Sequence, residues 1–494
     1  MGSHQASDDR LSRAAGPRAG VVAVIFVATI FVATAFVGLG CGRPIAFAPA
    51  DVAAAQPLHS VPRGSGFFLG AATSAHQIEG GTHNDWTDWE KGSYPDGTPH
   101  VAGGASAARI ADSWNLWRTD LAALQLIGAN AYRLGVEWSR LEPSPGAWDD
   151  AAAARYREMF AGLRAAGITP IVNLYHFTLP TWVAARGGWD WDGAPAALAA
   201  FAGRAGAAFG DLVDWWCTIN EPNVLVAKGY LAGQWPPGVR DPRRAALALA
   251  ALMRAHGLMT RALREQDRAD ADGDGHATRV GIAHNLRLFD PYSVRPIDGI
   301  VAGAADWFYN ESFLDAVTLG RVRVVLPKVI DIDEPFPALA GSFDYLGINY
   351  YTRDLIVGHL RGDHPYEVAA VPGQPRNDLG WEIYPEGLYR LLARYARRGW
   401  PLFVTENGIA DGRDVQRAEF LRAHLYAVDR ARAEGLDVIG YLHWSLIDNF
   451  EWSHGTNGRF GLFKVDFNDP LLLRRPTAAV AVFQEAARNL GTLR

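Results

Sequence analysis

Short apolar runs alternate with longer Ala- and Arg-rich stretches along this 494-residue chain, and this alternation constrains its fold more than any other feature. The apolar runs have the length and composition of buried strands, and the stretches between them have helical character. Eight such runs occur, at Phe67–Ala72, Ala129–Trp138, Thr169–His176, Val213–Glu221, Arg279–Leu286, Phe343–Tyr351, Pro401–Gly408 and Val438–Leu446. Repeated βα units are typical of a parallel sheet. We therefore predict an α/β fold, a single (β/α)8 TIM barrel with long βα loops.

The N-terminal part of the chain does not fit this pattern. Residues 21–40 (VVAVIFVATIFVATAFVGLG) carry no charge, follow several arginines, and are enough to cross a bilayer. The arginines favour a cytoplasmic N-terminus and place the rest of the chain on the far side of the membrane. We predict a basic tail at 1–20, a transmembrane signal anchor or signal peptide at 21–40, an Ala/Pro-rich linker at 41–65 and the barrel domain at 66–494.

Three interpretations of residues 21–40 stay open. An uncleaved signal anchor fits the length best, because the apolar part of a cleaved signal peptide is usually about 7–15 residues long. A lipoprotein signal would make Cys41 the lipidated residue. A start codon assigned too far upstream would instead leave a cytoplasmic protein. The first two predict a membrane-anchored or secreted protein whose barrel is extracytoplasmic, and the first predicts membrane attachment through this segment.

Composition excludes several classes of function. The 47 Lys and Arg are scattered among 53 Asp and Glu, which argues against a nucleic-acid partner. Two cysteines, Cys41 and Cys217, build neither a disulfide framework nor a CxxC zinc site. The segment 270–275 (DADGDG) begins like a calcium loop, but Gly281 stands where a bidentate Glu is needed, so we predict a solvated turn. We predict no metal, no cofactor and a small-molecule substrate.

Most of the predicted strands end in a side chain suited to chemistry. In a barrel of this kind the carboxyl ends of the strands meet at one mouth, where substrates bind. These endings are Gln77, Arg133, His176, Asn220 with Glu221, Asn349 with Tyr351, Glu406 and Trp444. A single polar residue at a strand end often has only a structural role, but so many polar strand ends in one barrel predict a shared pocket.

Two of the endings are carboxylates, Glu221 in TINEPN and Glu406 in VTENG. Burial raises the pKa of a carboxyl group and a nearby arginine lowers it, so two such groups can be divided into an acid and an anion. Cleavage of a glycosidic bond requires that division. The alternative interpretation is that each glutamate forms a structural ion pair with an arginine.

At these residues the sequence, from Phe67 to the C-terminus, resembles glycoside hydrolase family 1, the β-glucosidase and β-galactosidase family. TINEPN and VTENG match its two signature segments. Further matches are FFLGAATSAHQIEG (67–80), NAYRLGVEWSRLEPSPGAWD (130–149), YHFTLP (175–180), GQWPPG (233–238), GINYYTR (347–353), HWSLIDNFEWSHG (443–455) and RFGLFKVDF (459–467). Their order and spacing carry the resemblance, because each short motif alone could occur by chance.

The resemblance implies a retaining double displacement with Glu221 as acid/base and Glu406 as nucleophile, their carboxyl groups about 5–5.5 Å apart. We expect Arg133 to keep Glu406 ionised, and the negative Glu406 to keep Glu221 protonated. Tyr351 is similar to the family tyrosine that hydrogen-bonds the nucleophile. A tyrosine that only packs at the barrel mouth is the alternative.

The resemblance also implies a sugar site. Gln77, His176, Asn220, Glu451 and Trp452 would bind hydroxyls of the nonreducing sugar, Trp444 would form the platform, Phe460 would lie near the exocyclic carbon, and Asn349 would belong to the same pocket. A negative Glu451 would repel a 6-phosphate, so we expect unphosphorylated glycosides. Phe177 departs from the tryptophan of most members, and the segments 306–327 and 358–377 match poorly, which leaves the sugar epimer and the leaving group open.

Three functions are consistent with these residues. The first is hydrolysis of terminal β-linked glucose- or galactose-type residues by a glycosidase. The second is a membrane-associated β-transglycosidase that uses the same two carboxylates and passes the sugar to another acceptor. The third is a non-catalytic sugar-binding protein.

Overall fold

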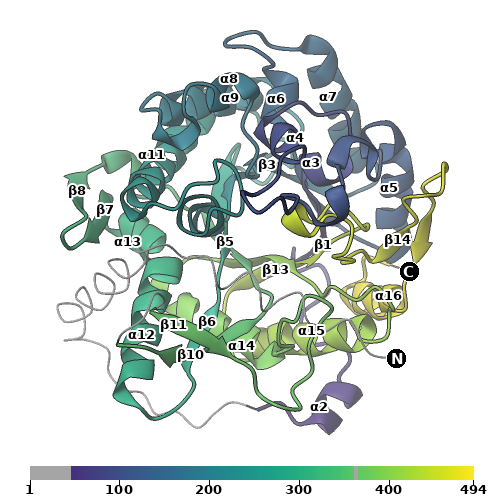
Figure 1. Ribbon diagram of the computed structural model, residues 1–494. Helices are drawn as coiled ribbons and strands as arrows, with labels where there is room; N and C mark the ends of the chain where they lie inside the picture. Colours follow the sequence, from purple (N-terminus) through teal and green to yellow (C-terminus); the bar gives the residue numbers. More distant parts are fainter. Residues whose placement is uncertain (1–45, 361–364, 494) are drawn as a thin grey trace.

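The computed structural model describes residues 46–360 and 365–493, and eight parallel strands in it close into a barrel (Figure 1). The strands are β1 (Phe68–Ala72), β2 (Ala131–Gly135), β3 (Thr169–Tyr175), β4 (Trp215–Asn220), β5 (Arg279–Asn285), β9 (Tyr345–Asn349), β12 (Leu402–Asn407) and β13 (Val438–Trp444). Each strand pairs with the next one of the barrel in sequence, and β13 pairs with β1 to close it. The predicted (β/α)8 fold is confirmed, and each observed strand lies within its predicted run.

A helix follows each barrel strand and covers its outer face. In chain order these helices are α5 (Ser113–Ile127), α7 (Asp150–Ala165), α9 (Ala194–Phe209), α11 (Pro242–Gln266), α13 (Ser312–Leu319), α14 (Pro385–Tyr395), α15 (Arg417–Ala433) and α16 (Ala479–Leu490). Asp149 and Asp241 cap α7 and α11 by accepting hydrogen bonds from backbone N–H groups of the first helical turn. Such caps satisfy donors that the helix itself leaves unpaired.

The long βα loops carry additional elements. A three-stranded sheet combines β6 (Leu288–Pro291), β10 (Arg353–Gly358) and β11 (Tyr366–Ala369), and hairpins form from β7 (Arg321–Leu326) with β8 (Ile330–Pro335) and from β14 (Phe463–Val465) with β15 (Arg474–Pro476). The further helices are α2 (Pro49–Ala54), α3 (Ala75–Ile78), α4 (Asp85–Trp89), α6 (Trp138–Leu141), α8 (Thr181–Ala184), α10 (Pro222–Leu225) and α12 (Pro296–Asp306). Two π-helical segments occur, at Val226–Leu231 and Trp307–Glu311.

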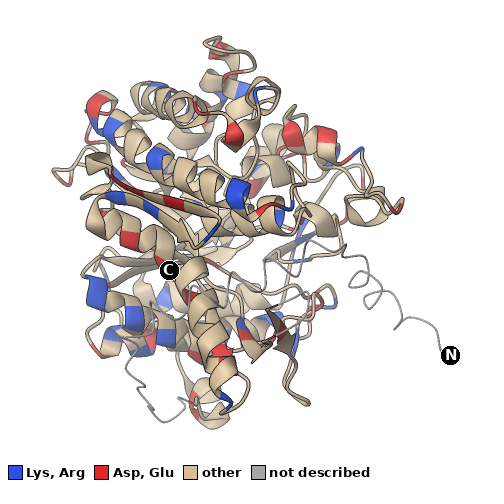
Figure 2. Ribbon diagram, turned by 60° about the vertical axis from the view of Figure 1, so that its left-hand side comes forward, with Lys and Arg blue, Asp and Glu red and all other residues tan. Residues whose placement is uncertain are grey.

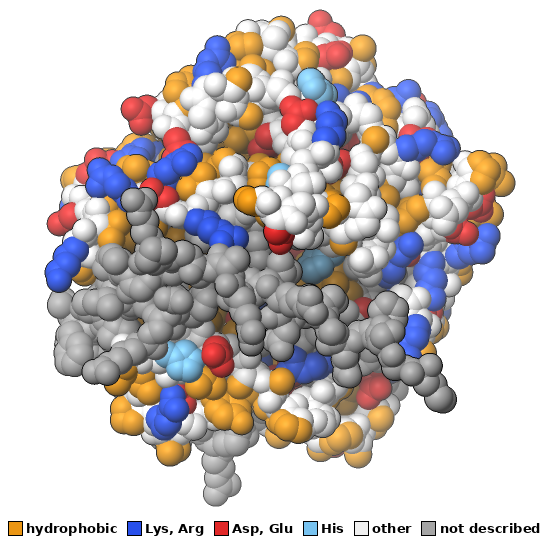
Figure 3. All heavy atoms as spheres, in the orientation of Figure 1, with side chains coloured by type: hydrophobic (Ala, Val, Ile, Leu, Met, Phe, Trp, Pro, Cys, Tyr) orange, Lys and Arg blue, Asp and Glu red, His pale blue; other side chains and the backbone are white. Residues whose placement is uncertain are grey.

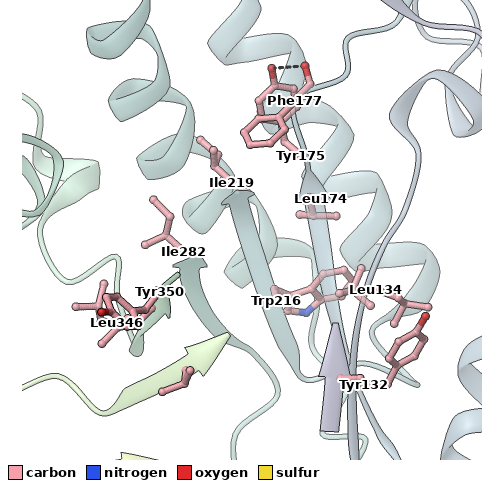
Figure 4. Close-up of a cluster of buried hydrophobic side chains, with 14 of the residues drawn as sticks. Tyr132, Leu134, Leu174, Tyr175, Phe177, Trp216, Ile219, Ile282, Leu346 and Tyr350 are labelled. Carbon is pink, nitrogen blue, oxygen red and sulfur yellow. Dashed lines mark hydrogen bonds between the residues drawn. The ribbon is translucent and has the colours of Figure 1, made fainter. Parts of the chain in front are cut away.

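The strands bury both faces. On the outer face, Leu134, Leu174, Trp216, Ile282 and Leu346 come from five neighbouring strands and pack beneath the helices (Figure 4). A separate cluster fills the barrel interior with residues that include Ala131, Ile171, Trp215, Tyr345, Phe403 and Leu442. Full burial of one large apolar side chain contributes about 1.5–3 kcal/mol, so the two layers together stabilise the barrel.

Lys and Arg are interspersed with Asp and Glu along the described chain (Figure 2), and charged side chains of both signs are mixed on the face that Figure 3 shows. No large area of a single sign is visible on the described part of the face that Figure 3 shows.

Residues 46–65, part of the Ala/Pro-rich linker predicted over 41–65, pack against the barrel domain. Phe47, Leu58 and Val61 are buried in the main core, and α2 lies against α15. Ser60 donates a hydrogen bond through its backbone N–H to the carboxylate of Asp429 at 2.9 Å. These contacts make the segment part of the barrel domain.

The predicted membrane segment, residues 21–40, lies outside the described residues, as do the basic tail and Cys41. Within 46–360 and 365–493, every helix is too short or too polar to cross a bilayer. Membrane attachment therefore stays a prediction.

Candidate active site

The carboxyl ends of the barrel strands bring every predicted site residue to one mouth. Arg133 lies within β2, Asn220, Asn349 and Trp444 are the last residues of their strands, and Glu406 is the next to last residue of β12. His176, Glu221 and Tyr351 follow their strands by one or two residues, and Gln77 lies on α3 after β1. Glu451, Trp452 and Phe460 come from the loop after β13. The pocket is thus assembled from segments that are far apart in the sequence.

Glu406 is buried and held through both carboxyl oxygens. Arg133 donates to its Oε1 at 2.5 Å, and the hydroxyl of Tyr351 donates to its Oε2 at 2.6 Å. Burial raises the pKa of Glu406 above its ordinary value, while Arg133 and Tyr351 oppose this increase. The expected effect of Arg133 is therefore present, but burial outweighs it.

Glu221 has different surroundings, because within the described part of the chain its carboxyl group accepts side-chain hydrogen bonds from amides. Asn285 and Asn349 donate hydrogen bonds to its Oε1 at 2.8 and 2.9 Å. Burial raises the pKa of Glu221 to about 7, and the negative charge of Glu406 adds to the increase. At neutral pH a large share of Glu221 is therefore protonated, which is the state of a carboxyl group that donates a proton.

Asn220 connects the two carboxyl groups. Its Oδ1 accepts from Arg133 at 2.7 Å and from Asn349 at 3.1 Å. Since Arg133 also binds Glu406 and Asn349 also binds Glu221, one continuous chain of hydrogen bonds joins the two carboxyl groups. Such a network fixes the side chains before any substrate enters.

The backbone is irregular near both glutamates, at the carboxyl ends of β4 and β12. The pairing register shifts between Cys217 and Asn220 on β4 and between Val404 and Glu406 on β12. Glu221 itself has a left-handed backbone with φ of 46°, which is rare for a residue other than glycine. Irregular pairing and strained backbone are often found at active sites, where they turn a side chain out of the regular alternation.

Near-parallel rings form one wall of the pocket. His76 stacks on Trp452, Trp452 on His176, and His176 on Trp444, with angles of 14°, 15° and 19° between the ring planes. Trp444, at the end of this series, is 3% exposed, and Phe460 packs edge-on against Tyr351. Flat apolar faces of this kind match the C–H face of a sugar ring.

Polar groups lie around these rings. Asn220 contacts Nε2 of His176 at 3.1 Å, and burial lowers the pKa of His176 well below its ordinary value, so the ring is neutral. Gln77 donates to the backbone oxygen of Phe450 at 2.7 Å. Amide and imidazole groups can both donate to and accept from sugar hydroxyls.

Glu451 is the third carboxyl group of the pocket. Burial raises its pKa to about 8, with contributions from Glu406 and Glu221, and Gln77 and Trp444 hydrogen-bond to it. Its Oε2 is buried without a hydrogen-bond partner among the described residues. The expectation of a negative Glu451 therefore needs correction at pH 7, because burial, together with the charges of Glu406 and Glu221, favours its neutral form.

Two functional residues escaped the sequence analysis. Asn285 ends β5, the one predicted strand to which no polar ending was assigned, because its predicted run continued to the apolar Leu286. Tyr309, whose hydroxyl donates to Asn285 at 2.9 Å, lies in the segment 306–327, which matched the family poorly. Asn285 could have been predicted, because a polar residue stands one position before the end of the predicted strand 279–286. No local sequence pattern indicated Tyr309.

The DADGDG turn is also organised by its own hydrogen bonds. Ligand oxygens of Asp214, Asp270 and Asp272 lie within 4.8 Å of one another. Asp214 binds Arg164 at 2.7 Å, and Asp270 accepts from backbone N–H groups of Gly273 and Gly275. Asp214 and Asp270 thus use carboxylate oxygens as acceptors for an arginine and for backbone N–H groups of the protein.

Comparison with known proteins places this pocket in context. The family model of "Glycosyl hydrolase family 1" matches residues 60–492. The chain is 32% identical to a β-galactosidase of Pyrococcus woesei, over 86% of this chain and 97% of that protein. Among solved structures, a β-glycosidase from Pyrococcus horikoshii matches with a TM-score of 0.76 and 35% identity, over 88% of this chain and 96% of the other. A Thermotoga maritima β-glucosidase in complex with glucoimidazole matches with a TM-score of 0.79 and 29% identity, over 87% and 99% of the two chains.

Proposed function

Because the chain belongs to glycosyl hydrolase family 1, we propose that it removes terminal β-linked glucose- or galactose-type residues from an aglycone or short oligosaccharide with retention of configuration. The observation that supports this proposal is the unequal pair of buried carboxyl groups, one bound by an arginine and a tyrosine and the other by two amides. Such a pair meets the requirement for one nucleophile and one acid.

In the first step, Glu406 attacks the anomeric carbon while Glu221 gives its proton to the leaving oxygen. The glycosidic bond breaks, the aglycone leaves as an alcohol, and the sugar becomes an ester of Glu406. Arg133 and Tyr351 support this step by stabilising the carboxylate form of Glu406 against the effect of burial.

In the second step, Glu221 acts as a base. Esterification removes the negative charge of Glu406, which is one of the causes of the raised pKa of Glu221. Glu221 now remains ionised after it has given up its proton, so it can take a proton from water as the water attacks the anomeric carbon. The sugar is released with its original configuration, and both glutamates return to their starting states.

The other residues of the pocket would hold the sugar. We assign hydroxyl contacts to Gln77, His176, Asn220, Glu451 and Trp452, the platform to Trp444, the exocyclic side to Phe460 and the support of both carboxyl groups to Asn349. We assign the 2-hydroxyl to Asn220, a contact that strengthens in the transition state.

The test is the release of the aryl group from a panel of aryl β-D-glycosides by the full chain. The full chain is preferred because Phe47, Leu58 and Val61 belong to the core. We expect one or two sugars to react, with the β-anomer as the first product seen by NMR. A first product of α configuration would contradict retention, and binding without turnover on all sugars would favour a sugar-binding protein. Adding a sugar acceptor measures transglycosylation against hydrolysis.

The pH dependence follows from Glu221. Its proton must be present in the free enzyme, and its pKa is about 7, so kcat/KM is expected to decrease as the pH rises above about 7. Glu406 must be ionised, so kcat/KM is also expected to decrease at low pH, where that group is protonated. A kcat/KM profile that stays flat from pH 6 to 9 would contradict the role of Glu221.

Unphosphorylated substrates are expected to be preferred over their 6-phosphates. A phosphate dianion would lose its solvation in a buried pocket and would be repelled by the carboxylate of Glu406, and together these costs predict a kcat/KM ratio of at least about 100. Because the pKa of Glu451 is about 8, we expect the ratio to grow as the pH rises through that value. The measurement compares 4-nitrophenyl β-D-glucoside with its 6-phosphate, and a faster reaction of the 6-phosphate would refute the preference.

A further inference from the structure

Two amide side chains bind the same oxygen of Glu221, and each amide is held in one orientation by a hydroxyl group. Asn285 and Asn349 both donate to Oε1 of Glu221. On the other side of each amide, Tyr309 donates to Oδ1 of Asn285 at 2.9 Å, and Thr405 donates to Oδ1 of Asn349 at 2.7 Å. Because an amide accepts only at its oxygen and donates only at its nitrogen, each hydroxyl directs Nδ2 toward Glu221.

This arrangement makes the two oxygens of Glu221 unequal. Oε1 accepts two N–H groups, so it is the unprotonated oxygen when the carboxyl group is in its acid form. Oε2 has no hydrogen-bond partner among the described residues. The acidic proton is therefore on Oε2, the oxygen left free to reach a substrate.

The position of Tyr309 is set by the loop that carries it. Tyr309 lies in the π-helical segment Trp307–Glu311, and Asn223 donates both to its backbone oxygen at 3.0 Å and to that of Asn285 at 2.8 Å. The next residue, Asn310, donates to the backbone oxygen of Arg287 at 2.7 Å. Hydrogen bonds from Asn223, in the turn after Glu221, thus join the backbone of Tyr309 to the end of β5. π-Helical insertions of this kind often occur at functional sites.

We propose that Tyr309 is a positioning residue for the acid/base step, acting through Asn285 to keep Oε1 of Glu221 occupied and Oε2 directed at the leaving oxygen. This inference rests on the proposed role of Glu221. It adds a residue from the βα loop after β5 to the support of Glu221, whose direct hydrogen-bond donors Asn285 and Asn349 are the last residues of β5 and β9.

The inference predicts a change in pH dependence as well as in rate. The Asn285 hydrogen bond lowers the pKa of Glu221 against the effect of burial. Loss of one hydrogen bond to a charged group is worth about one pH unit. In Tyr309→Phe, Asn285 is free to turn, so the high-pH limb of kcat/KM is expected to move upward by up to about one unit. Asn285→Leu, which removes the donor itself, is expected to move it by about one unit.

The rate effect depends on the leaving group. A phenyl glycoside needs the proton from Glu221, whereas a 2,4-dinitrophenyl glycoside leaves with little assistance. For Tyr309→Phe we expect about a tenfold loss of kcat/KM on the phenyl glycoside and less than about a twofold loss on the dinitrophenyl one. Tyr292→Phe, which removes a hydroxyl from a tyrosine that is 51% exposed, is the matched control and is expected to change neither value.

An unmoved high-pH limb in both Tyr309→Phe and Asn285→Leu, with equal losses on the two substrates, would overturn the inference and leave these residues a structural role. That result differs from failure of the proposed function, in which a Glu221→Ala protein would hydrolyse the phenyl glycoside at the parent rate.

Discussion

Glu406→Gln is expected to bind glycosides but to hydrolyse them at least about 10⁴-fold more slowly than the parent, the order of loss seen when a catalytic nucleophile is removed. Glutamine has nearly the same shape, and its Oε1 can still accept from Arg133, while its amide nitrogen takes the place of the oxygen that accepts from Tyr351. Its amide, however, carries no negative charge and cannot form the ester. The measurement is the steady-state release of 4-nitrophenol from the most reactive aryl glycoside.

Glu265→Gln is the matched control, because that glutamate is 60% exposed on α11 and its change is expected to leave kcat within about twofold. A 2-deoxy-2-fluoro glycoside with a good leaving group gives an independent measurement. It is expected to leave a covalent sugar on the peptide that contains Glu406, as seen by mass spectrometry. A Glu406→Gln protein with more than a few per cent of the parent rate, or a label on another peptide, would remove Glu406 from the nucleophile's role.

Glu221→Ala is expected to lose about 10²–10⁴-fold on glycosides with poor leaving groups and to regain part of its rate when azide is added. The alanine leaves space beside the anomeric carbon and removes the base that activates water. With a dinitrophenyl glycoside the first step still proceeds, so the glycosyl ester of Glu406 accumulates. Azide needs no deprotonation and can attack that ester in place of water.

The product of this rescue is the diagnostic measurement. Attack on the ester from the face opposite Glu406 gives a β-glycosyl azide, which NMR distinguishes from the α-anomer. Formate, a small acid that can replace the missing base, is expected to restore hydrolysis instead. If Glu221→Ala matched the parent rate on a phenyl glycoside, or if azide gave the α-anomer, the acid/base assignment would be wrong.

Most of the pocket could be predicted from strand endings because a closed parallel barrel brings all its carboxyl ends to one rim. His176, Asn220, Asn349 and Trp444 needed no knowledge of packing beyond that rule, whereas Gln77 lies on α3, beyond the end of β1. Asn285 was missed because its predicted strand was drawn one residue too long, into Leu286. Tyr309 could not be found in this way, because it reaches the site from a π-helical loop and contacts Asn285 through the tip of its side chain.

The sequence by itself determined the number of strands, the barrel and the identity of the two carboxylates, because strand periodicity and family motifs are local properties of the chain. Only the tertiary structure decided how the two carboxylates differ. Register shifts interrupt the regular pairing of β4 and β12, and Glu221 follows β4 with a left-handed backbone. The charge on Arg133, brought from β2, then lies against Glu406, while amides lie against Glu221. A pKa depends on burial and on charges within a few ångströms, and those neighbours are set only when the barrel closes.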